Sequence, residues 1–253
     1  LLTLTACAVP AAVFANNQDT PGGYGTRPHI IINATRTPTQ ISDIASSVTV
    51  IDREDIERQS RATVSDLLRA TPGITVAGNG GPGQPTRLFL RGTNSNHVLV
   101  VMDGVRINDP SDPGDAFDLS NLTTDMVERI EILRGPQSTL YGSQALGGVI
   151  NIVTRQGKGA FSTNALAEVG RYGSKRINAG ASGELGKTSY SLQGGYYGLK
   201  GISSFDRKFG GLEKDGSDIY TLGGNLATRF SDAFTGKFSA RYNQTIAEFD
   251  KFT

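Results

Sequence analysis

The stretch VERIEILRGPQSTLYGSQALGGVINIVTR, Val127 to Arg155, decides the fold of this chain. In its first part, Ile130 and Ile132 alternate with Arg129 and Glu131. This alternation is the period of a strand that buries one face and exposes the other. We therefore predict a half-buried strand that begins at Val127.

A glycine-lined corner follows this strand. Arg134-Gly135-Pro136 ends the strand, and Pro136 suits the first position of a short helical turn that closes at Gly142. Gly147-Gly148 then opens a second strand, Val149 to Thr154. Two strands around a tight corner are also typical of a soluble α+β domain, so the stretch alone leaves the function open.

Composition limits the classes of protein. The chain has 253 residues, a mass of 26.8 kDa and a formal charge of +1, so it lacks the basic excess of a nucleic-acid-binding protein. Hydrophobic residues make up 37% of the chain, and no apolar run reaches the roughly 18 to 20 residues of a spanning helix. Any passage through a membrane would therefore use strands.

The N-terminal segment Leu1 to Ala15 is apolar and ends in Val-Phe-Ala, which is typical of a truncated signal peptide cleaved after Ala15. Leu4 to Cys7 also resembles a lipoprotein cleavage box. The apolar run continues past Cys7, so simple cleavage is the favoured alternative. An exported chain that loses Cys7 has neither disulfides nor thiol chemistry.

A polar leader with proline and glycine follows the signal peptide. It contains one short β-branched segment, His29 to Arg36, between Pro28 and Pro38. The free N–H and C=O groups of such a segment suit either an edge strand of this chain or a strand offered to a partner sheet.

The middle of the chain predicts a strand, a helical stretch and two more strands. Thr63 and Asp66 form a capping pair inside the helical stretch, so we expect two short helices there. The predicted elements are Ser47 to Ile51, Arg53 to Arg69, Thr86 to Arg91 and the buried strand Val98 to Met102.

Catalytic and nucleotide-binding motifs are incomplete. The glycine-rich loop Asn79 to Pro85 lacks the Lys-Ser/Thr pair of a phosphate loop. Ser95, His97 and Asp103 lie close in sequence, but no nucleophile elbow surrounds the serine. The loop Asn108 to Asp118 carries four aspartates whose spacing does not fit an EF-hand, so a solvated loop and a metal site both remain open.

After Gly157 the pattern changes to a series of alternating strands. Ile177 and Ala179 face away from Arg176 and Asn178, so that one face suits lipid and the other water. The predicted strands are Asn164 to Val169, Arg176 to Ser182, Ser189 to Tyr197, Tyr220 to Phe230 and Phe234 to Asn243.

The connections between these strands alternate in length. Leu185 to Thr188 and Ser231 to Ala233 are tight turns, whereas Gly198 to Asp218 is a long polar loop at the opposite end. Short turns at one rim and long loops at the other indicate an outer-membrane barrel. A soluble β-sandwich shares the alternation, although its inner face is usually more apolar.

Three segments resemble TonB-dependent outer-membrane receptors, and the resemblance extends from about His29 to the C-terminus. They are LRATPGITV (Leu68 to Val76), FLRGTNSNHVLVVMDGVRIND (Phe89 to Asp109) and ERIEILRGPQSTLYGSQALGGVINIVTR (Glu128 to Arg155). Within that family, the second segment and the preceding GNGGPGQ look most like the BtuB-type cobalamin transporters.

The resemblance implies an α+β plug domain, a small mixed sheet with short helices, followed by the first antiparallel strands of a transmembrane β-barrel. It divides the chain into a truncated signal peptide (1–15), a flexible leader with the Ton box (16–40), the plug domain (41–157) and the N-terminal part of the barrel (158–253). About 22 strands close such a barrel, so we expect the chain to be a fragment of a longer receptor. The expected location is the bacterial outer membrane, in contact with its lipid.

The function that the resemblance implies is active uptake of a scarce, bulky nutrient, with binding and gating instead of enzymatic catalysis. The energy would come from the inner membrane through TonB, which pairs with the Ton box. The Ton box would be Ile30, Ile31, Ile32, Asn33 and Ala34. A soluble periplasmic binding module is the alternative from another class.

The resemblance also assigns roles to residues of the plug domain. Arg91 and Arg134 stand in the matched RG motifs, and an arginine in a plugged lumen needs carboxylate partners, so we expect both to lock the plug to the barrel. The ligand-binding loops of the family match Pro85, Arg87, Asn94, Asp112 and Pro113.

Two expectations concern the metal and the ligand. Glu213, Asp215 and Asp250 fall near positions where cobalamin receptors bind calcium, and carboxylates suit that hard cation, although a solvated acidic loop is equally compatible. The four aspartates of the loop Asn108 to Asp118 would repel an anionic ferric siderophore. We therefore expect cobalamin as the ligand, with ferric siderophores as the main alternative.

Overall fold

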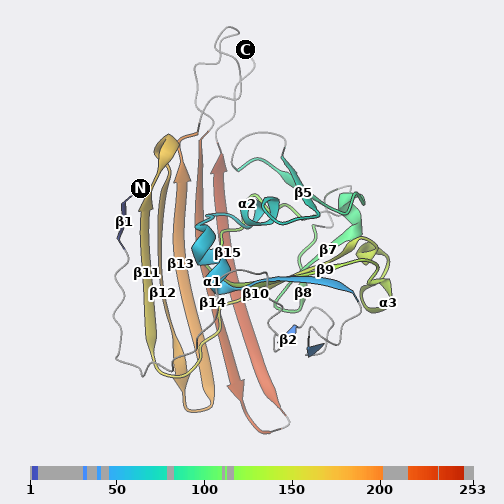
Figure 1. Cartoon of the computed structure of the whole chain (residues 1–253). Helices are drawn as coiled ribbons and strands as arrows, with labels where there is room; N and C mark the ends of the chain where they lie inside the picture. The colour runs from blue at the N-terminus through green and yellow to red at the C-terminus, as the bar shows by residue number, and fades with distance from the viewer. Residues whose placement is uncertain are drawn as a thin grey trace, which may run out of the picture.

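The computed structural model describes residues 46–78, 83–109, 112, 117–201, 216–232 and 234–247, and the short strands β1 (Leu2–Leu4), β2 (Ile31–Ile32) and β3 (Thr39–Gln40). A tall sheet, here called the wall sheet, carries a smaller domain on one face, here called the inner domain (Figure 1). The strands of the inner domain run crosswise to those of the wall sheet (Figure 1). Within the described residues, no helix is long and apolar enough to cross a membrane.

A five-stranded mixed sheet forms the middle of the inner domain, in the order β4-β9-β10-β7-β8. Only the β10–β7 pair is parallel in this sheet. The strands are β4 (Ser47–Ile51), β7 (Val98–Met102), β8 (Val105–Arg106), β9 (Val127–Arg134) and β10 (Gly148–Thr154). The two strands predicted around the glycine-lined corner are β9 and β10, and they pair directly.

Two short helices and a hairpin cover one face of this sheet. Helix α1 (Arg53–Gln59) follows its N-cap Asp52, and α2 (Val64–Arg69) follows its N-cap Thr63, whose hydroxyl accepts a hydrogen bond from the backbone N–H of Asp66 as predicted. The hairpin consists of β5 (Ile74–Gly78) and β6 (Thr86–Leu90). Between them lies the main apolar core, which includes Ile56, Leu67, Leu90, Ile130, Ile132, Ile150 and Ile152.

The opposite face of the same sheet is also covered, by α3 (Ser138–Tyr141) and the 3-10 turn η3 (Ser143–Ala145). The predicted half-buried β9 is therefore wrong, because Glu131 is fully buried. Its carboxylate accepts hydrogen bonds from Arg129 Nε at 2.7 Å and from Asn151 Nδ2 at 2.8 Å. These two donors offset the cost of burying the charge, which the alternation of residue types alone does not reveal. Helix α3 also begins two residues after the predicted position, Pro136.

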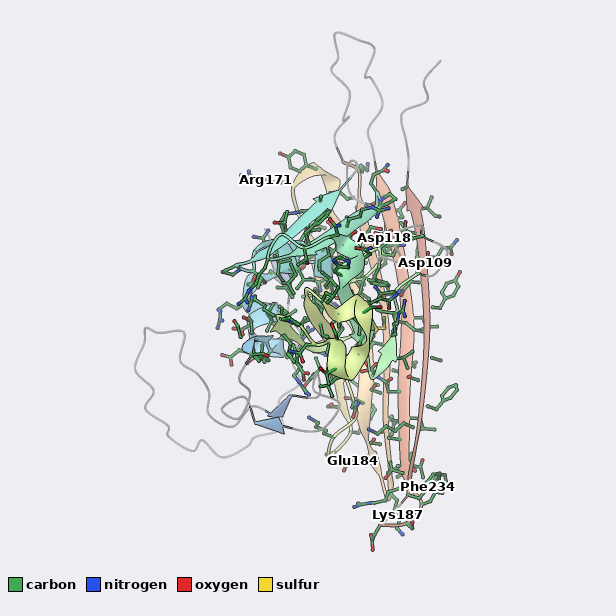
Figure 2. The ribbon with its side chains drawn as sticks, turned by 90° about the vertical axis from the view of Figure 1, so that its right-hand side faces the viewer. Asp109, Asp118, Arg171, Glu184, Lys187 and Phe234 are labelled. Carbon is green, nitrogen blue, oxygen red and sulfur yellow. The ribbon has the colours of Figure 1, made fainter. Side chains whose placement is uncertain are left out.

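The wall sheet has six strands in the order β1-β11-β12-β13-β14-β15, all antiparallel. The strands after β1 are β11 (Ser162–Val169), β12 (Lys175–Leu185), β13 (Thr188–Leu199), β14 (Ser217–Arg229) and β15 (Thr235–Ala247). Figure 2 shows Lys187 and Phe234 at the end with the tight turns and Arg171 at the opposite end. The strand β1 lies within the expected signal peptide, whose other residues are outside the described part.

The two faces of the wall sheet differ as predicted. Toward the inner domain, Arg176, Asn178, Ser191, Gln193 and Thr221 are polar and at most 5% exposed, because the inner domain covers them. Large apolar side chains lie on the outer face, and five of them are each more than half exposed: Ile177, Leu192, Leu222, Phe238 and Tyr242. A soluble protein rarely exposes so large an apolar surface, so the soluble-module alternative does not fit this sheet.

The outward apolar face has the height of a membrane-facing band. From Ile177 to Leu185, β12 advances about 26 Å at roughly 3.3 Å per residue. A strand tilt of about 40° reduces this height to about 20 Å, close to the roughly 25 Å apolar band of outer-membrane barrels.

Substitution of Gly148 tests the corner that joins β9 to β10. Its φ is 148°, and a Cβ there would overlap the carbonyl oxygen of Leu133 and the side chain of Leu90. For a residue with a side chain, this backbone conformation alone lowers the free energy of unfolding by about 1–3 kcal/mol. The overlap lowers it further. We expect Gly148→Ala to make the inner domain of the full-length receptor susceptible to limited proteolysis.

Gly135→Ala is the matched control for this variant. Gly135 also has a positive φ, 109°, but among the described residues no atom of a non-neighbouring residue lies within 4 Å of a Cβ built there. The control should therefore show the effect of backbone strain alone. Equal proteolysis of both variants would contradict the role assigned to close packing at Gly148.

Candidate functional site

The long-loop end of the inner domain forms a polar corner around Asp118. Its Oδ1 accepts hydrogen bonds from the Thr86 backbone N–H at 2.9 Å, the Thr86 hydroxyl at 3.1 Å and the Ser120 backbone N–H at 2.9 Å. Its Oδ2 accepts one from the Ser120 hydroxyl at 2.7 Å. Asp118 therefore ties the start of β6 to the end of the acidic loop.

Two residues predicted to contact the ligand meet beside this corner. Arg87 Nη2 donates to Asp112 Oδ1 at 3.0 Å, and their side chains are 44% and 24% exposed. Pro85 is exposed at the start of the same strand. Asn94 lies beyond the opposite end of β6, so this strand separates it from Arg87. Pro113 lies outside the described residues.

The acidic loop carries less free charge than the sequence indicates. Asp118 accepts four hydrogen bonds, and Asp112 is paired with Arg87. We expected the aspartates to repel an anionic ligand because we assumed that their carboxylates have no internal partners. For Asp112 and Asp118 that assumption is wrong, because their charge is already offset within the inner domain.

Arg134, predicted to lock the plug to the barrel, makes its described contacts inside the inner domain. It is 8% exposed, and it donates to Thr49 Oγ1 at 2.6 Å and to the Pro72 carbonyl at 2.9 Å. Burial lowers the pKa of its guanidinium, and the nearby charge of Arg91 lowers this pKa further. Arg91 is itself exposed. Neutral acceptors thus hold Arg134 in place, and the locking role of Arg91 and Arg134 stays a prediction.

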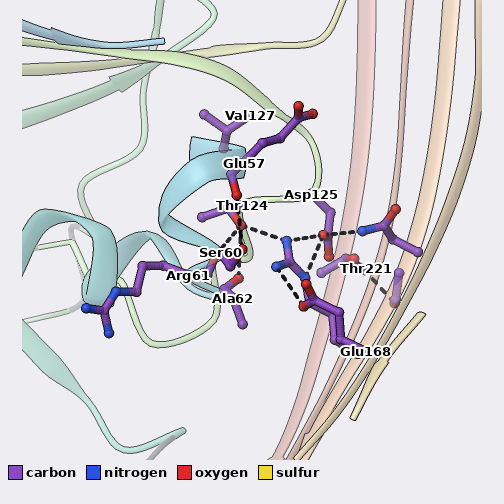
Figure 3. A network of polar contacts seen from close by, with 12 residues as sticks. Glu57, Ser60, Arg61, Ala62, Thr124, Asp125, Val127, Glu168 and Thr221 are labelled. Carbon is purple, nitrogen blue, oxygen red and sulfur yellow. Dashed lines mark hydrogen bonds and ion pairs between the residues drawn. The ribbon is translucent and has the colours of Figure 1, made fainter. Parts of the chain in front are cut away.

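A buried ion pair joins the inner domain to the wall sheet, and the sequence patterns did not reveal it. Arg176 of β12 donates to Asp125 Oδ1 from Nε at 3.0 Å and from Nη2 at 2.6 Å (Figure 3). Its Nη2 also donates to Thr124 Oγ1 at 2.9 Å, and Asn178 Nδ2 donates to Asp125 Oδ1 at 2.6 Å. Arg176 and Asp125 are 5% and 2% exposed. The segment just before β9 is therefore anchored on β12.

The end of β10 continues this contact across the wall sheet. Ser191 Oγ of β13 and Asn225 Nδ2 of β14 each donate to the Arg155 carbonyl at 2.7 Å. The backbone N–H of Arg155 in turn donates to the Met126 carbonyl at 2.9 Å. The contacts from β12 to β14 therefore form one continuous seam between the two parts.

A cavity of about 690 Å³ lies on the tight-turn side of this seam. Leu99, Val101 and Val153 of the inner sheet line it, together with Ala227, Lys237 and Ser239 of the wall sheet. The polar corner lies at the long-loop end of the wall sheet. Gly83, three residues before Thr86, lies beside Ser217 at the start of β14, because a Cβ on Gly83 would be 2.8 Å from Ser217 Cβ. From Ser217 to Ala227, β14 advances about 33 Å, so the seam separates the corner from the cavity.

Several predicted sites lie largely or wholly outside the described residues. They include the calcium residues Glu213, Asp215 and Asp250, and Ile30, Asn33 and Ala34 of the Ton box. Ile31 and Ile32 form β2, which pairs with β3. Within the part of the chain that the structure describes, no cluster of His, Cys, Asp and Glu could hold a metal ion.

Comparison with known proteins agrees with this arrangement. Residues 40–149 match the family model described as TonB-dependent Receptor Plug Domain. The chain is similar to the siderophore receptor PirA of Acinetobacter baumannii, with 28% identity, a TM-score of 0.62, and coverage of 79% of this chain and 32% of PirA. It is also similar to a mutant of the ferric enterobactin receptor PfeA of Pseudomonas aeruginosa in complex with enterobactin, with 25% identity, a TM-score of 0.63, and coverage of 81% and 34%.

The pyoverdine outer membrane receptor FpvA of Pseudomonas aeruginosa, bound to pyoverdine, shares the fold at 21% identity and a TM-score of 0.71, with coverage of 84% of this chain and 29% of FpvA. The chain thus spans about a third of the length of these receptors. Its fold is that of a plug domain followed by antiparallel strands that fit the start of a TonB-dependent receptor barrel, as predicted. Homologous receptors of this kind are outer-membrane proteins, which confirms the predicted location. The closer resemblance to BtuB-type transporters is not shown.

Substitution of Asp118 tests the structural role of the polar corner. Asp118→Ala leaves the Thr86 and Ser120 donors without their acceptor, which costs roughly 1–3 kcal/mol for a buried group. We expect faster hydrogen exchange at residues 84–90 of the full-length receptor. Asp112→Ala is the control, because an exposed ion pair contributes only about 0–1 kcal/mol. Equal exchange rates in the two variants would contradict this assignment.

Proposed function

We propose that the receptor to which this chain contributes takes up ferric siderophores across the bacterial outer membrane with energy supplied through TonB. The observation that carries the proposal is the inner domain seated on the polar face of a sheet whose other face is apolar. This is the arrangement of a plug inside a membrane barrel. The similar receptors PirA and PfeA, described as siderophore and ferric enterobactin receptors, support the substrate class.

The proposed activity is binding and gated passage, without covalent chemistry. The similar proteins are transport receptors, which supports a non-enzymatic role. Asp103, which lies near Ser95 and His97 in sequence, is engaged elsewhere, because its carboxylate accepts hydrogen bonds from Thr154 N at 2.8 Å and Thr154 Oγ1 at 2.6 Å. Asp103 therefore joins the end of β7 to the end of β10 within the inner sheet, and its Oδ2 also accepts a hydrogen bond from Arg241 Nη2 of the wall sheet at 3.4 Å.

Siderophores fit the polar corner better than the sequence alone indicated. Asp112 and Asp118 are offset by Arg87 and by hydrogen bonds, and Arg87 remains partly exposed to an incoming ligand. An anionic ferric complex would therefore meet a less negative surface than four free aspartates would present. Cobalamin, our expectation from the sequence, has no support from the similar receptors and remains the alternative ligand.

TonB is the proposed energising partner, and Ile30 to Ala34 the segment that it recruits. Ile31 and Ile32 pair with Gln40 and Thr39 in a strand of only two residues. A two-residue strand pair is only marginally stable by itself. A partner strand that pairs with this segment over more residues would therefore replace β3 at little cost in free energy. Calcium bound by Glu213, Asp215 and Asp250 remains a further proposal for the long-loop end.

The substrate class can be tested by equilibrium binding to the purified full-length receptor. We expect saturable binding of a ferric catecholate siderophore and none of cyanocobalamin, both measured with calcium present. Arg87→Glu should weaken siderophore binding about tenfold, because it reverses the charge that faces the ligand. Arg69→Gln, which alters an exposed ion pair of α2, is the control. Saturable binding of cyanocobalamin alone would overturn the choice of ligand.

The Ton box can be tested separately from binding. Proline lacks the backbone N–H of a sheet ladder and fixes φ, so Ile31→Pro should abolish energised uptake by the full-length receptor and leave ligand affinity unchanged. Ile31→Val keeps a β-branched strand former and should retain uptake. Normal uptake by the proline variant would show that TonB pairs elsewhere.

A further inference from the structure

The outer face of the wall sheet carries a polar hollow at its long-loop end. Residues paired in register form a row across four strands there: Lys175 (β12), Gly198 (β13), Asp218 (β14) and Ile246 (β15). Side chains two residues apart in a strand share a face, so Lys175 lies on the same face as the exposed Ile177. The row therefore faces away from the inner domain, just beyond the end of the apolar band.

The hollow has a fixed floor at Gly198. Because Gly198 has no side chain, Tyr196 leans over it, and a Cβ on Gly198 would overlap the Tyr196 hydroxyl. That hydroxyl donates a hydrogen bond to Asp218 Oδ1 at 2.6 Å. The space beside these side chains has a volume of about 410 Å³. Specific contacts between β13 and β14 therefore shape the hollow.

Two lysines line the hollow together with this carboxylate. Lys175 and Lys200 are exposed, and neither ammonium group has an ion-pair partner within the part of the chain that the structure describes. The stem of Lys200 crosses Gly173, because a Cβ there would be 3.0 Å from Lys200 Cγ and Cδ. Asp218 is the only acidic residue among the described residues that line the hollow. The lining therefore has an excess of positive charge.

The surroundings of the hollow favour a ligand with a large apolar part. Toward the tight turns, the same face presents Ile177, Leu192 and Leu222, each more than half exposed. At the hollow itself, the rings of Tyr196 and Tyr220 lie with their centroids 5.1 Å apart. Aromatic residues of this kind border the apolar band of outer-membrane barrels. The hollow therefore lies at the level of the lipid head groups.

Phosphate is the anionic group that fits this position. A lysine ammonium group binds phosphate as a compact point charge, and lysines at the edge of an apolar segment attract anionic lipid head groups. A free phosphate ion would gain only an exposed ion pair, which contributes little. A lipid also holds its acyl chains against the apolar face, and this second contact raises the local concentration of its phosphate at the lysines.

We propose that the hollow binds the phosphorylated head group of a lipid in the membrane leaflet at the long-loop end, with the acyl chains of that lipid on the apolar outer face. Lys175 and Lys200 pair with the phosphate. Asp218 positions the Tyr196 hydroxyl and weakens the attraction for the anion. This site lies outside the barrel, so it goes beyond the proposed function and does not depend on the ligand that is transported.

Binding of bisphosphorylated lipid A to the detergent-purified full-length receptor tests the site, with native mass spectrometry as the measurement. We expect Lys175→Gln with Lys200→Gln to weaken this binding about tenfold, because both ammonium groups next to the phosphate are lost. Lys158→Gln with Lys187→Gln removes two exposed lysines near the tight-turn end and is the matched control. Equal affinities of the two double variants would overturn the proposal.

The carboxylate in the hollow gives an effect of the opposite sign. Asp218→Asn keeps an acceptor for the Tyr196 hydroxyl and removes the negative charge. We therefore expect the variant to bind bisphosphorylated lipid A about threefold more tightly. A substitution that merely disturbed this end of the sheet would weaken binding. Unchanged or weaker binding by Asp218→Asn would contradict the pairing of the lysines with phosphate.

Competition distinguishes a lipid from a free anion. Inorganic phosphate at millimolar concentration should leave bisphosphorylated lipid A bound, and lipid A from which both phosphates have been removed should bind more weakly. Displacement by inorganic phosphate, or equal binding of the dephosphorylated lipid, would overturn the proposal. A receptor that binds the lipid through these lysines but imports no siderophore would contradict only the proposed function.

Discussion

The inner domain excludes water from the polar face of the wall sheet, and every polar group buried there therefore needs a partner. Arg176, Asn178, Ser191 and Asn225 all donate to the inner domain, to the side chains of Thr124 and Asp125 or to the Arg155 carbonyl. A polar face of this kind would suit a water-filled barrel without a plug. Here the same residues hold the plug at one height and in one orientation, so the arrangement of the two parts depends on satisfying them.

Local features of the fold could be predicted from the sequence because they depend on neighbouring residues. The Thr63 cap, the buried run Val98–Met102 and the alternation of Ile177 with Arg176 and Asn178 each leave a signal within a few positions. The burial of Glu131 left no such signal. It depends on Asn151, twenty positions away, and on a covered second face of the sheet. Alternation reports which residues share a face, but it does not report whether that face meets water.

The candidate site was harder to predict for the same reason. Arg176 was recognised as an inward residue, but its partner Asp125 is 51 positions away on another part of the fold. The aspartates of the acidic loop were recognised, but their charge was overestimated. The donors to Asp118 come from Thr86, 32 positions earlier, as well as from Ser120, two positions later. The number of aspartates in a loop predicts the charge of its surface only when the internal partners of each carboxylate are known.

The inner sheet meets the wall sheet at its edge, so the contact between the two parts and the folding core of the inner domain are separate. Strands β9 and β10 run crosswise to the wall strands (Figure 1), so at the seam they present the loop at Asp125 and the chain end at Arg155. Apolar residues of the inner sheet line the cavity beside the seam. The apolar core, from Ile56 to Ile152, is enclosed between the helices, the hairpin and the inner sheet. The seam itself joins mainly polar groups, with Met126 packed against Gly223, and it lies outside this core. Because apolar burial contributes most of the stability of a domain, the fold of the inner domain depends more on this core than on the polar contacts of the seam.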